Sequence, residues 1–200
     1  MKVIGLCGGS GSGKGAVGKI FADADIPVID TDAVYHTLTA SDSECLRELA
    51  DYFGDSIISD SGALDRKALA EIVFSSDSVH KRQTLNRIAH GHVLARVREM
   101  IGEFASEGYC MAVVDAPLLY ESGFNDECDV IIAVIADRNT RVARITKRDG
   151  LTEAQAQKRI DAQIADDVLK DRADYVVYNN CTLSDLEASV VSIISELKSK

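Results

Sequence analysis

A glycine-rich turn near the start of the chain constrains its fold more than any other feature. Residues 8–14 read G-G-S-G-S-G-K, directly after an apolar run at residues 3–7 and before Ala16, Val17 and Ile20 at helical spacing. In such a strand–loop–helix setting, the backbone N–H groups of the loop and its lysine can surround phosphate groups. A bare glycine-rich turn is common, but the whole pattern in this setting predicts a phosphate-binding loop (P-loop) for ATP.

The expected ATP contacts come from this loop and from the helix that follows it. Lys14 is expected to reach the β- and γ-phosphates, and it counts among the candidate catalytic residues. The remaining loop candidates bring backbone N–H groups close to phosphate oxygens, and they are Gly9, Gly11, Ser12, Gly13, Gly15 and Ala16.

The loop departs from the usual pattern at the residue after the lysine. A Ser or Thr there normally binds Mg²⁺ through its hydroxyl, but this chain has Gly15 followed by Ala16. We therefore expect Mg²⁺ to rely on phosphate oxygens, water and a nearby carboxylate. Asp115, at the end of the apolar run at residues 110–115, is the candidate for that carboxylate and is expected to act through water.

Strand-like and helical patterns alternate along the chain. The strand-like runs lie at residues 3–7, 26–30, 110–115, 130–136 and 174–178. Near-continuous apolar runs suit strands that are covered on both faces, and alternation with helices predicts an α/β fold with a three-layer parallel sheet. The last helix should bury one face made by Leu183, Leu186, Val190, Ile193, Ile194 and Leu197.

Two insertions interrupt this core within a single domain of 200 residues. About eighty residues separate the second and third strands, far more than a crossover helix needs. We expect a core of about 1–32, 108–137 and 171–200, an inserted helical acceptor-binding region of about 33–107, and a helical lid of about 138–170.

Charge and cysteine content exclude several classes of protein. The formal net charge of −10 argues against a nucleic-acid or membrane partner, because those surfaces repel an acidic protein. The five cysteines show no C-x-x-C spacing and indicate neither a zinc site nor a disulfide framework. Cys7 and Cys110 are expected in the core. The N-terminus lacks the pattern of a signal peptide, so the expected location is the cytoplasm.

Two aspartates close the second strand. Strand ends of a parallel sheet face the ligand crevice, so a carboxylate there can orient a hydroxyl or accept its proton. The segment D-T-D at residues 30–32 also opens a helical stretch, and either Asp30 or Asp32 could be a helix N-cap instead. These residues alone leave the two interpretations about equally supported.

Arg141, Arg144, Arg148 and Arg159 fall in the second insertion. Arginines on a helical lid can neutralise the charge on a transferring phosphoryl group. A solvated helix face is the alternative, and for Arg141 and Arg159 it is the favoured interpretation.

With these features placed, the chain resembles the dephospho-coenzyme A kinase family from about residue 3 to residue 185. The resemblance is carried by I-G-L-C-G-G-S-G-S-G-K, V-I-D-T-D, G-A-L-D-R-K-A-L, L-N-R-I-A-H, D-A-P-L-L-Y-E-S-G, R-I-T-K-R-D-G-L-T and A-D-Y-V-V-Y-N-N. The P-loop is widely shared, whereas the ordered set is specific to this family.

The resemblance implies that ATP phosphorylates the ribose 3′-hydroxyl of dephospho-coenzyme A. By position, Asp32 matches the catalytic aspartate and Arg144 a lid arginine. The resemblance also implies that Arg148, Asn179 and Asn180 bind ATP. The residues implied to surround the acceptor are His36, Leu64, Arg66, Asn86, His90, Leu118, Leu119 and Glu121, together with Asp32.

This chain departs from the family pattern at Gly15, Ala16, His36 and Gly91. His36 stands where an arginine is usual, which weakens one contact to the acceptor's phosphate because neutral imidazole replaces a guanidinium. Two alternatives stay open: another small-molecule P-loop kinase, for nucleosides or nucleotides, and a catalytically inactive nucleotide-binding regulator. Lys14, Asp32 and Arg144 argue against the regulator. Oligomeric state is not determined by these residues.

Overall fold

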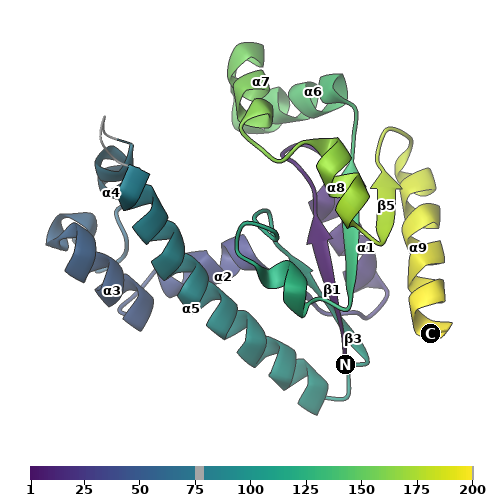
Figure 1. Cartoon of the computed structure of the whole chain (residues 1–200), viewed down its shortest axis with the longest axis horizontal. Helices are drawn as coiled ribbons and strands as arrows, with labels where there is room; N and C mark the ends of the chain where they lie inside the picture. The colour runs from purple at the N-terminus through teal and green to yellow at the C-terminus, as the bar shows by residue number, and fades with distance from the viewer. Residues whose placement is uncertain (75–78, 200) are drawn as a thin grey trace. The chain divides into compact units, whose positions relative to one another are not determined.

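The computed structural model describes residues 1–74 and 79–199. In order, its elements are β1 (Lys2–Cys7), α1 (Lys14–Asp23), β2 (Val28–Asp30), α2 (Thr31–Leu38), α3 (Glu44–Phe53), η1 (Asp55–Ile57), α4 (Arg66–Val73), α5 (Val79–Ser106), β3 (Met111–Asp115), η2 (Phe124–Glu127), β4 (Val130–Ile135), α6 (Arg138–Asp149), α7 (Glu153–Asp161), α8 (Asp166–Arg172), β5 (Tyr175–Tyr178) and α9 (Leu183–Ser199) (Figure 1). The chain forms two compact units, Met1–Ile29 with Ile101–Lys200, and Asp30–Met100.

The sheet has the strand order β2-β3-β1-β4-β5 among the described residues. β1 pairs in parallel with β3 and β4, and β4 pairs in parallel with β5. Leu6, near the end of β1, stands opposite Asp115 of β3 and Ile132 of β4. Because parallel strands end at the same edge, the P-loop after β1 and the carboxylate of Asp115 meet at one end of the sheet.

Both faces of the sheet are covered, which explains the near-continuous apolar runs. α1 and α9 cover one face, where Phe21 of α1 packs with Val190 of α9 in the main core (Figure 1). The segment after β3 lies against the other face, so close that a Cβ at Gly5 of β1 would be 3.0 Å from Leu119. Glycine at position 5 therefore lets the segment after β3 lie directly on the sheet.

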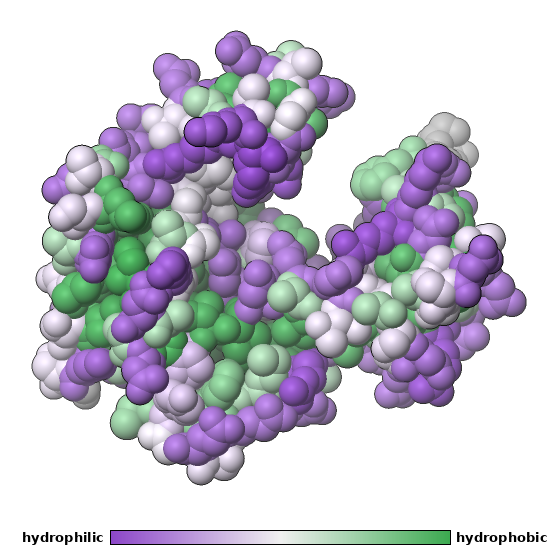
Figure 2. Space-filling view, turned by 180° about the vertical axis from the view of Figure 1, so that it is seen from behind, coloured by the Kyte–Doolittle hydropathy of each residue, from purple (hydrophilic) through white to green (hydrophobic). Residues whose placement is uncertain are grey.

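The second insertion forms α6, α7 and the start of α8. α6 and α7 lie side by side and bury a small core of their own, with Ile145 of α6 against Ala156 of α7 (Figure 1). Thr152 caps α7 through a capping box with Gln155. The surface at this end of the larger unit is mostly hydrophilic on the face seen in Figure 2, as expected for helices that bury only one narrow stripe.

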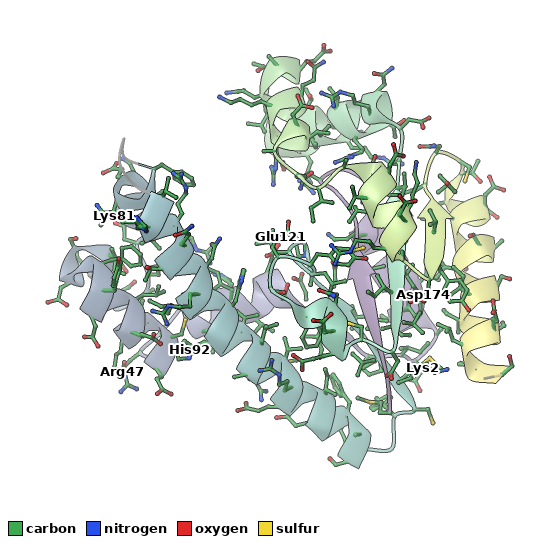
Figure 3. The ribbon with its side chains drawn as sticks, in the orientation of Figure 1. Lys2, Arg47, Lys81, His92, Glu121 and Asp174 are labelled. Atoms are coloured by element: carbon green, nitrogen blue, oxygen red, sulfur yellow. The ribbon has the colours of Figure 1, made fainter. Side chains whose placement is uncertain are left out.

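The smaller unit is helical, as expected for the first insertion. Its core joins α3, α4 and α5 through Leu49, Leu69 and Ile88. His92 of α5 adds a polar link between helices, since its Nε2 lies 2.7 Å from Oε2 of Glu48 on α3 (Figure 3).

The α/β fold with a parallel sheet is confirmed, and each predicted strand is present within one or two residues of its predicted limits. Two side chains that were predicted to be buried are exposed. Leu183 is 69% exposed, because it is the first residue of α9 and lies beyond the sheet-facing stripe. Cys110 is exposed because it precedes β3 and lies outside the covered part of the sheet. Among the described residues, no helix combines the length and apolar character of a membrane span.

Candidate functional site

The P-loop joins β1 to α1 in a conformation that requires glycine. Gly8, Gly11 and Gly13 have φ angles of 150°, 79° and 97°, a region that residues with a Cβ rarely adopt. A Cβ at Gly13 would lie 2.0 Å from Nδ2 of Asn179, so space as well as torsion excludes a side chain. The loop is therefore fixed both by its own backbone and by the residues packed around it.

The start of α1 suits an anion. Gly13 is the N-cap and supplies no side-chain hydrogen bond, and the first turn holds no acidic residue. The first N–H groups of a helix lack intrahelical acceptors, and the helix dipole adds positive potential there. The N-terminus of α1 can thus bind phosphate oxygens, with Lys14 as its charged side chain.

Lys14 is held at the end of the sheet by Asp115. Its Nζ lies 3.3 Å from Oδ1 of Asp115, and both side chains are only 15% exposed. A partly buried ion pair is screened little by solvent and fixes the direction of the lysine. The sequence predicted a role for each residue in phosphate or metal binding, and the structure brings the two together.

Asn179 supports the loop from the end of β5. Its Nδ2 donates to the carbonyl of Ser12 at 2.8 Å, and its own N–H donates to Ile135 O at 2.8 Å. Asn180, next in the chain, accepts from the N–H of Asp137 through Oδ1 at 2.7 Å, at the start of α6. The two asparagines that resemblance assigns to ATP therefore hold the backbone around the P-loop in this structure.

Arg144 of α6 lies directly against the P-loop. Its Nη1 donates to the carbonyls of Gly11 and Ser12, both at 3.2 Å, and its Nη2 to the carbonyl of Asn179 at 3.1 Å. All its acceptors are uncharged, and within residues 1–74 and 79–199 no carboxylate pairs with it. Its positive charge remains available to an anionic ligand at the loop.

Arg141, one turn earlier, is not solvated as predicted. It is 3% exposed, and its Nη1 lies 2.8 Å from Oδ1 of Asp166. Its Nε donates to Ser10 O at 2.9 Å and its Nη2 to Oε1 of Gln163 at 3.0 Å. The prediction failed because tertiary contacts supply the charge partner and acceptors that allow a guanidinium to be buried.

The two other candidate arginines, Arg148 and Arg159, share one partner. Arg148 Nε lies 2.7 Å from Oδ1 of Asp149, and Arg159 Nη1 lies 2.8 Å from Oδ2 of the same carboxylate. The pKa of Asp149 is lowered, first by its hydrogen bond from Arg148. Both arginine side chains are about half exposed, in keeping with the solvated face favoured for Arg159.

The turn after β3 lies beside the P-loop. A small cavity of about 70 Å³ is lined by both segments, together with residues 162–164 and Leu169. In this turn Leu118 and Glu121 are exposed, and Glu121 points away from the sheet (Figure 3). Leu119 is buried in the core, so its side chain is not accessible to a ligand. Tyr120 Oη donates to Arg172 O at 3.2 Å, which ties the turn to the end of α8.

Cys7 lines the same cavity but is not a reactive thiol. Burial raises the pKa of Cys7 to about 11, and burial likewise raises the pKa of its hydrogen-bond partner Tyr120 to about 12. Both groups are therefore neutral near pH 7. Neither side chain therefore offers an ionised nucleophile to a molecule in this cavity.

Asp30 and Asp32 take different places at the start of α2, in the smaller unit. Asp30 is the N-cap, and its Oδ1 accepts from the N–H of Asp32 at 2.9 Å and of Ala33 at 3.1 Å. Asp32 is exposed in the first helical turn. The N-cap interpretation thus applies to Asp30 and not to Asp32.

The acceptor candidates of the smaller unit lie on α2, α4 and α5, and in the isolated bridge just before α4. Arg66, the first residue of α4, hydrogen-bonds through Nη2 to Nδ1 of His36 on α2. Asn86 and His90 are one turn apart on α5 and so share a face. Leu64 is buried in this unit's core, which leaves only its backbone for contact with a ligand.

The residues present fit a divalent metal that arrives with a nucleotide. Asp115 offers one carboxylate, and Oγ of Ser12 is buried without a hydrogen-bond partner among the described residues. Within residues 1–74 and 79–199, no group of three His, Cys, Asp or Glu side chains could hold a metal ion. One carboxylate with phosphate oxygens and waters is a common way to hold Mg²⁺, whereas a resident metal needs more protein ligands.

Comparison with known proteins decides the family. The family model described as dephospho-CoA kinase matches residues 2–185. A dephospho-CoA kinase of Corynebacterium glutamicum is 36% identical over 197 residues, covering 98% of both chains. This chain belongs to the dephospho-CoA kinase family.

Solved structures share the fold of this chain. The crystal structure of TT1252 from Thermus thermophilus has a TM-score of 0.80 and 29% identity, covering 98% of this chain and 97% of its own. A dephospho-CoA kinase from Campylobacter jejuni has a TM-score of 0.72 at 23% identity, covering 98% of both chains. The latter similarity supports the P-loop kinase fold.

Two residues beside the P-loop, Gln163 and Asp166, were missed in the sequence of this dephospho-CoA kinase family member. Arg141, which both of them contact, was named but was expected to be solvated. One signal was available, because Arg141 is four residues before the buried Ile145 and so lies on the inward face of α6. Nothing in the spacing of Gln163 or Asp166 indicated that they would meet Arg141.

Proposed function

We propose that this chain transfers the γ-phosphoryl group of ATP to the ribose 3′-hydroxyl of dephospho-coenzyme A, giving coenzyme A and ADP. The observation that carries the proposal is the match of the dephospho-CoA kinase family model to residues 2–185. The P-loop, with its uncapped helix N-terminus and charged lysine, supplies the chemistry that such a transfer needs.

In this mechanism the 3′-oxygen forms a bond to the γ-phosphorus while the bond from that phosphorus to the bridging oxygen of ADP breaks. Asp32 orients the hydroxyl and accepts its proton. Lys14 and the N–H groups at the start of α1 bind the phosphate oxygens. Arg144, whose charge has no carboxylate partner in the described residues, neutralises charge that develops on the transferring group.

Mg²⁺ belongs to this proposal as the metal that accompanies ATP. Asp115 and the Ser12 hydroxyl are the protein groups suited to it, and when bound it would neutralise phosphate charge. Acceptor contacts are proposed for His36, Arg66, Asn86 and His90, together with Leu118 and Glu121. A cytoplasmic location and the absence of a nucleic-acid partner also belong to this proposal. Because the net charge of −10 repels anions, the anionic substrates must be held by local donors such as the P-loop.

The decisive experiment measures ADP release with different acceptors. We expect ADP to form with dephospho-coenzyme A and not with adenosine or nucleoside monophosphates, and the product to carry a new phosphate at the 3′ position by mass spectrometry and NMR. Equal turnover with a nucleoside monophosphate would instead indicate a nucleotide kinase. ATP binding without turnover on any acceptor would indicate a regulator.

Gly15→Ser is expected to lower the Mg²⁺ concentration needed for half-maximal activity. Gly15 is exposed in the first turn of α1, and a Cβ there would meet no atom within 4 Å. The new hydroxyl would therefore stand where P-loops usually supply a metal ligand. The measurement is activity against free Mg²⁺ at saturating ATP.

Gly15→Ala is the matched control, because it adds the same Cβ and the same gain in helix propensity without a hydroxyl. It should leave the Mg²⁺ requirement unchanged. If Gly15→Ser needs as much metal as Gly15→Ala, another group already fills the role of the missing hydroxyl.

A further inference from the structure

We infer that Arg141 is a positioning residue for the P-loop, acting with Gln163 and Asp166 as a clamp on the backbone of Ser10. The inference rests on the proposed function, since it assigns a role in ATP binding to residues outside the phosphate contacts. These three side chains are called the Ser10 clamp below.

Both polar groups of Ser10 are held by the clamp. The N–H of Ser10 donates to Oε1 of Gln163 at 2.8 Å, and the carbonyl of Ser10 accepts from Nε of Arg141 at 2.9 Å. Gln163 Oε1 also accepts from Nη2 of Arg141 at 3.0 Å, which closes a ring of hydrogen bonds around the Ser10 backbone. The peptide before Ser10 is held by its donor and the peptide after Ser10 by its acceptor, so neither can rotate without breaking a hydrogen bond.

Asp166 makes burial of the clamp arginine possible. Its two carboxylate oxygens lie 2.8 and 3.1 Å from Nη1 of Arg141. Desolvation of an unpaired guanidinium would be costly, and this pair compensates the charge. Arg141 therefore carries no free charge for a phosphate, in contrast to Arg144 on the same helix.

The loop is shaped to receive Arg141. A Cβ at Gly9 would lie 2.1 Å from Nη2 of Arg141, and one at Gly11 would lie 2.7 Å from its backbone carbonyl. Two P-loop glycines are thus needed because Arg141 packs against them. Arg141 and Arg144 lie one turn apart on the same face of α6. The clamp therefore also fixes α6 relative to the loop that Arg144 contacts.

The test separates positioning from plain stabilisation. The double variant Arg141→Met with Asp166→Leu removes the buried ion pair together, which such pairs often tolerate without loss of stability. We expect it to melt near the wild-type temperature but to bind ATP about 10-fold more weakly by calorimetry, the size of effect expected for one lost charge-assisted hydrogen bond. If it binds ATP like the wild type, the role of Arg141 is structural and the inference is wrong.

A second variant keeps the test decisive if the double variant does not fold. Gln163→Ala leaves no unpaired charge, and it should speed exchange of the Ser10 amide hydrogen by about 10-fold or more, as read by NMR, because that hydrogen loses its acceptor. ATP binding should weaken several-fold in the same variant. Unchanged exchange and unchanged ATP affinity would overturn the inference.

Arg138→Met is the matched control. Arg138 is on the same helix and pairs with Asp161 at 2.7 Å, but its exposed ion pair does not touch the P-loop. It should change neither Ser10 exchange nor ATP affinity. Absence of ATP binding by the wild-type protein would contradict the proposed function itself, whereas equal binding by wild type and clamp variants contradicts only this inference.

Discussion

Lys14→Ala is expected to lower turnover by at least about 10²-fold, which corresponds to about 2.7 kcal/mol of transition-state stabilisation. Lys14 is the charged side chain of the P-loop, and its Nζ is already directed to the end of the sheet by Asp115. Loss of the ammonium removes the group that compensates charge on the β- and γ-phosphates. Steady-state turnover with dephospho-coenzyme A measures the effect.

Lys19→Ala is the control for this substitution. Lys19 is on the same helix, but it is exposed and pairs with Asp23 at 2.7 Å, away from the loop. Its removal should change turnover little, since an exposed ion pair contributes little. Melting curves of both variants establish that the fold is kept. Near wild-type turnover by a folded Lys14→Ala protein would refute the P-loop assignment.

Asp32→Asn is expected to bind ATP with little change while its turnover falls by at least about 10²-fold, the usual loss for a positioned base. The asparagine keeps the size of the side chain and one acceptor oxygen, but it cannot take a proton. Asp32 is not the N-cap of α2, so the helix should form as before. Calorimetry for ATP and steady-state rates for dephospho-coenzyme A provide the two measurements.

Asp30→Asn is the matched control for Asp32→Asn. Asp30 accepts two N–H groups at the start of α2, and asparagine is an equally good N-cap, so stability and turnover should both be near wild type. If Asp30→Asn is inactive and Asp32→Asn turns over normally, the catalytic carboxylate is Asp30. The pair thus tests the catalytic and N-cap interpretations, which the residues alone left about equally supported.

Much of the fold could be predicted because its signals are local. The loop at residues 8–14 has backbone torsions that require glycine, and a helix begins at its end. Both features can therefore be recognised from the sequence. Strands buried on both faces produce apolar runs, and those runs placed each strand within one or two residues. Cys110 and Leu183, which were wrongly expected to be buried, lie at the ends of elements. There the apolar pattern does not indicate whether a side chain is covered by a neighbouring element.

The state of each arginine was decided by tertiary structure. The spacing of Arg141, Arg144 and Arg148 on one helix does not predict which of them pairs with a carboxylate. Arg141 is buried because the fold brings Asp166, Gln163 and the Ser10 carbonyl to it, and Arg148 is paired with its neighbour Asp149. Arg144 receives only uncharged acceptors in the described residues and keeps its charge for a ligand.

The sequence by itself determined the P-loop, the order of strands and helices and the resemblance to one kinase family, because these depend on residues near one another in the chain. The structure decided that Asp30 caps α2, and only its tertiary packing decided that Lys14 pairs with Asp115 and that Arg141 clamps Ser10. The last two contacts join residues about 100 or more positions apart. Such contacts depend on how separate elements pack, and the pattern of any one element does not contain that information.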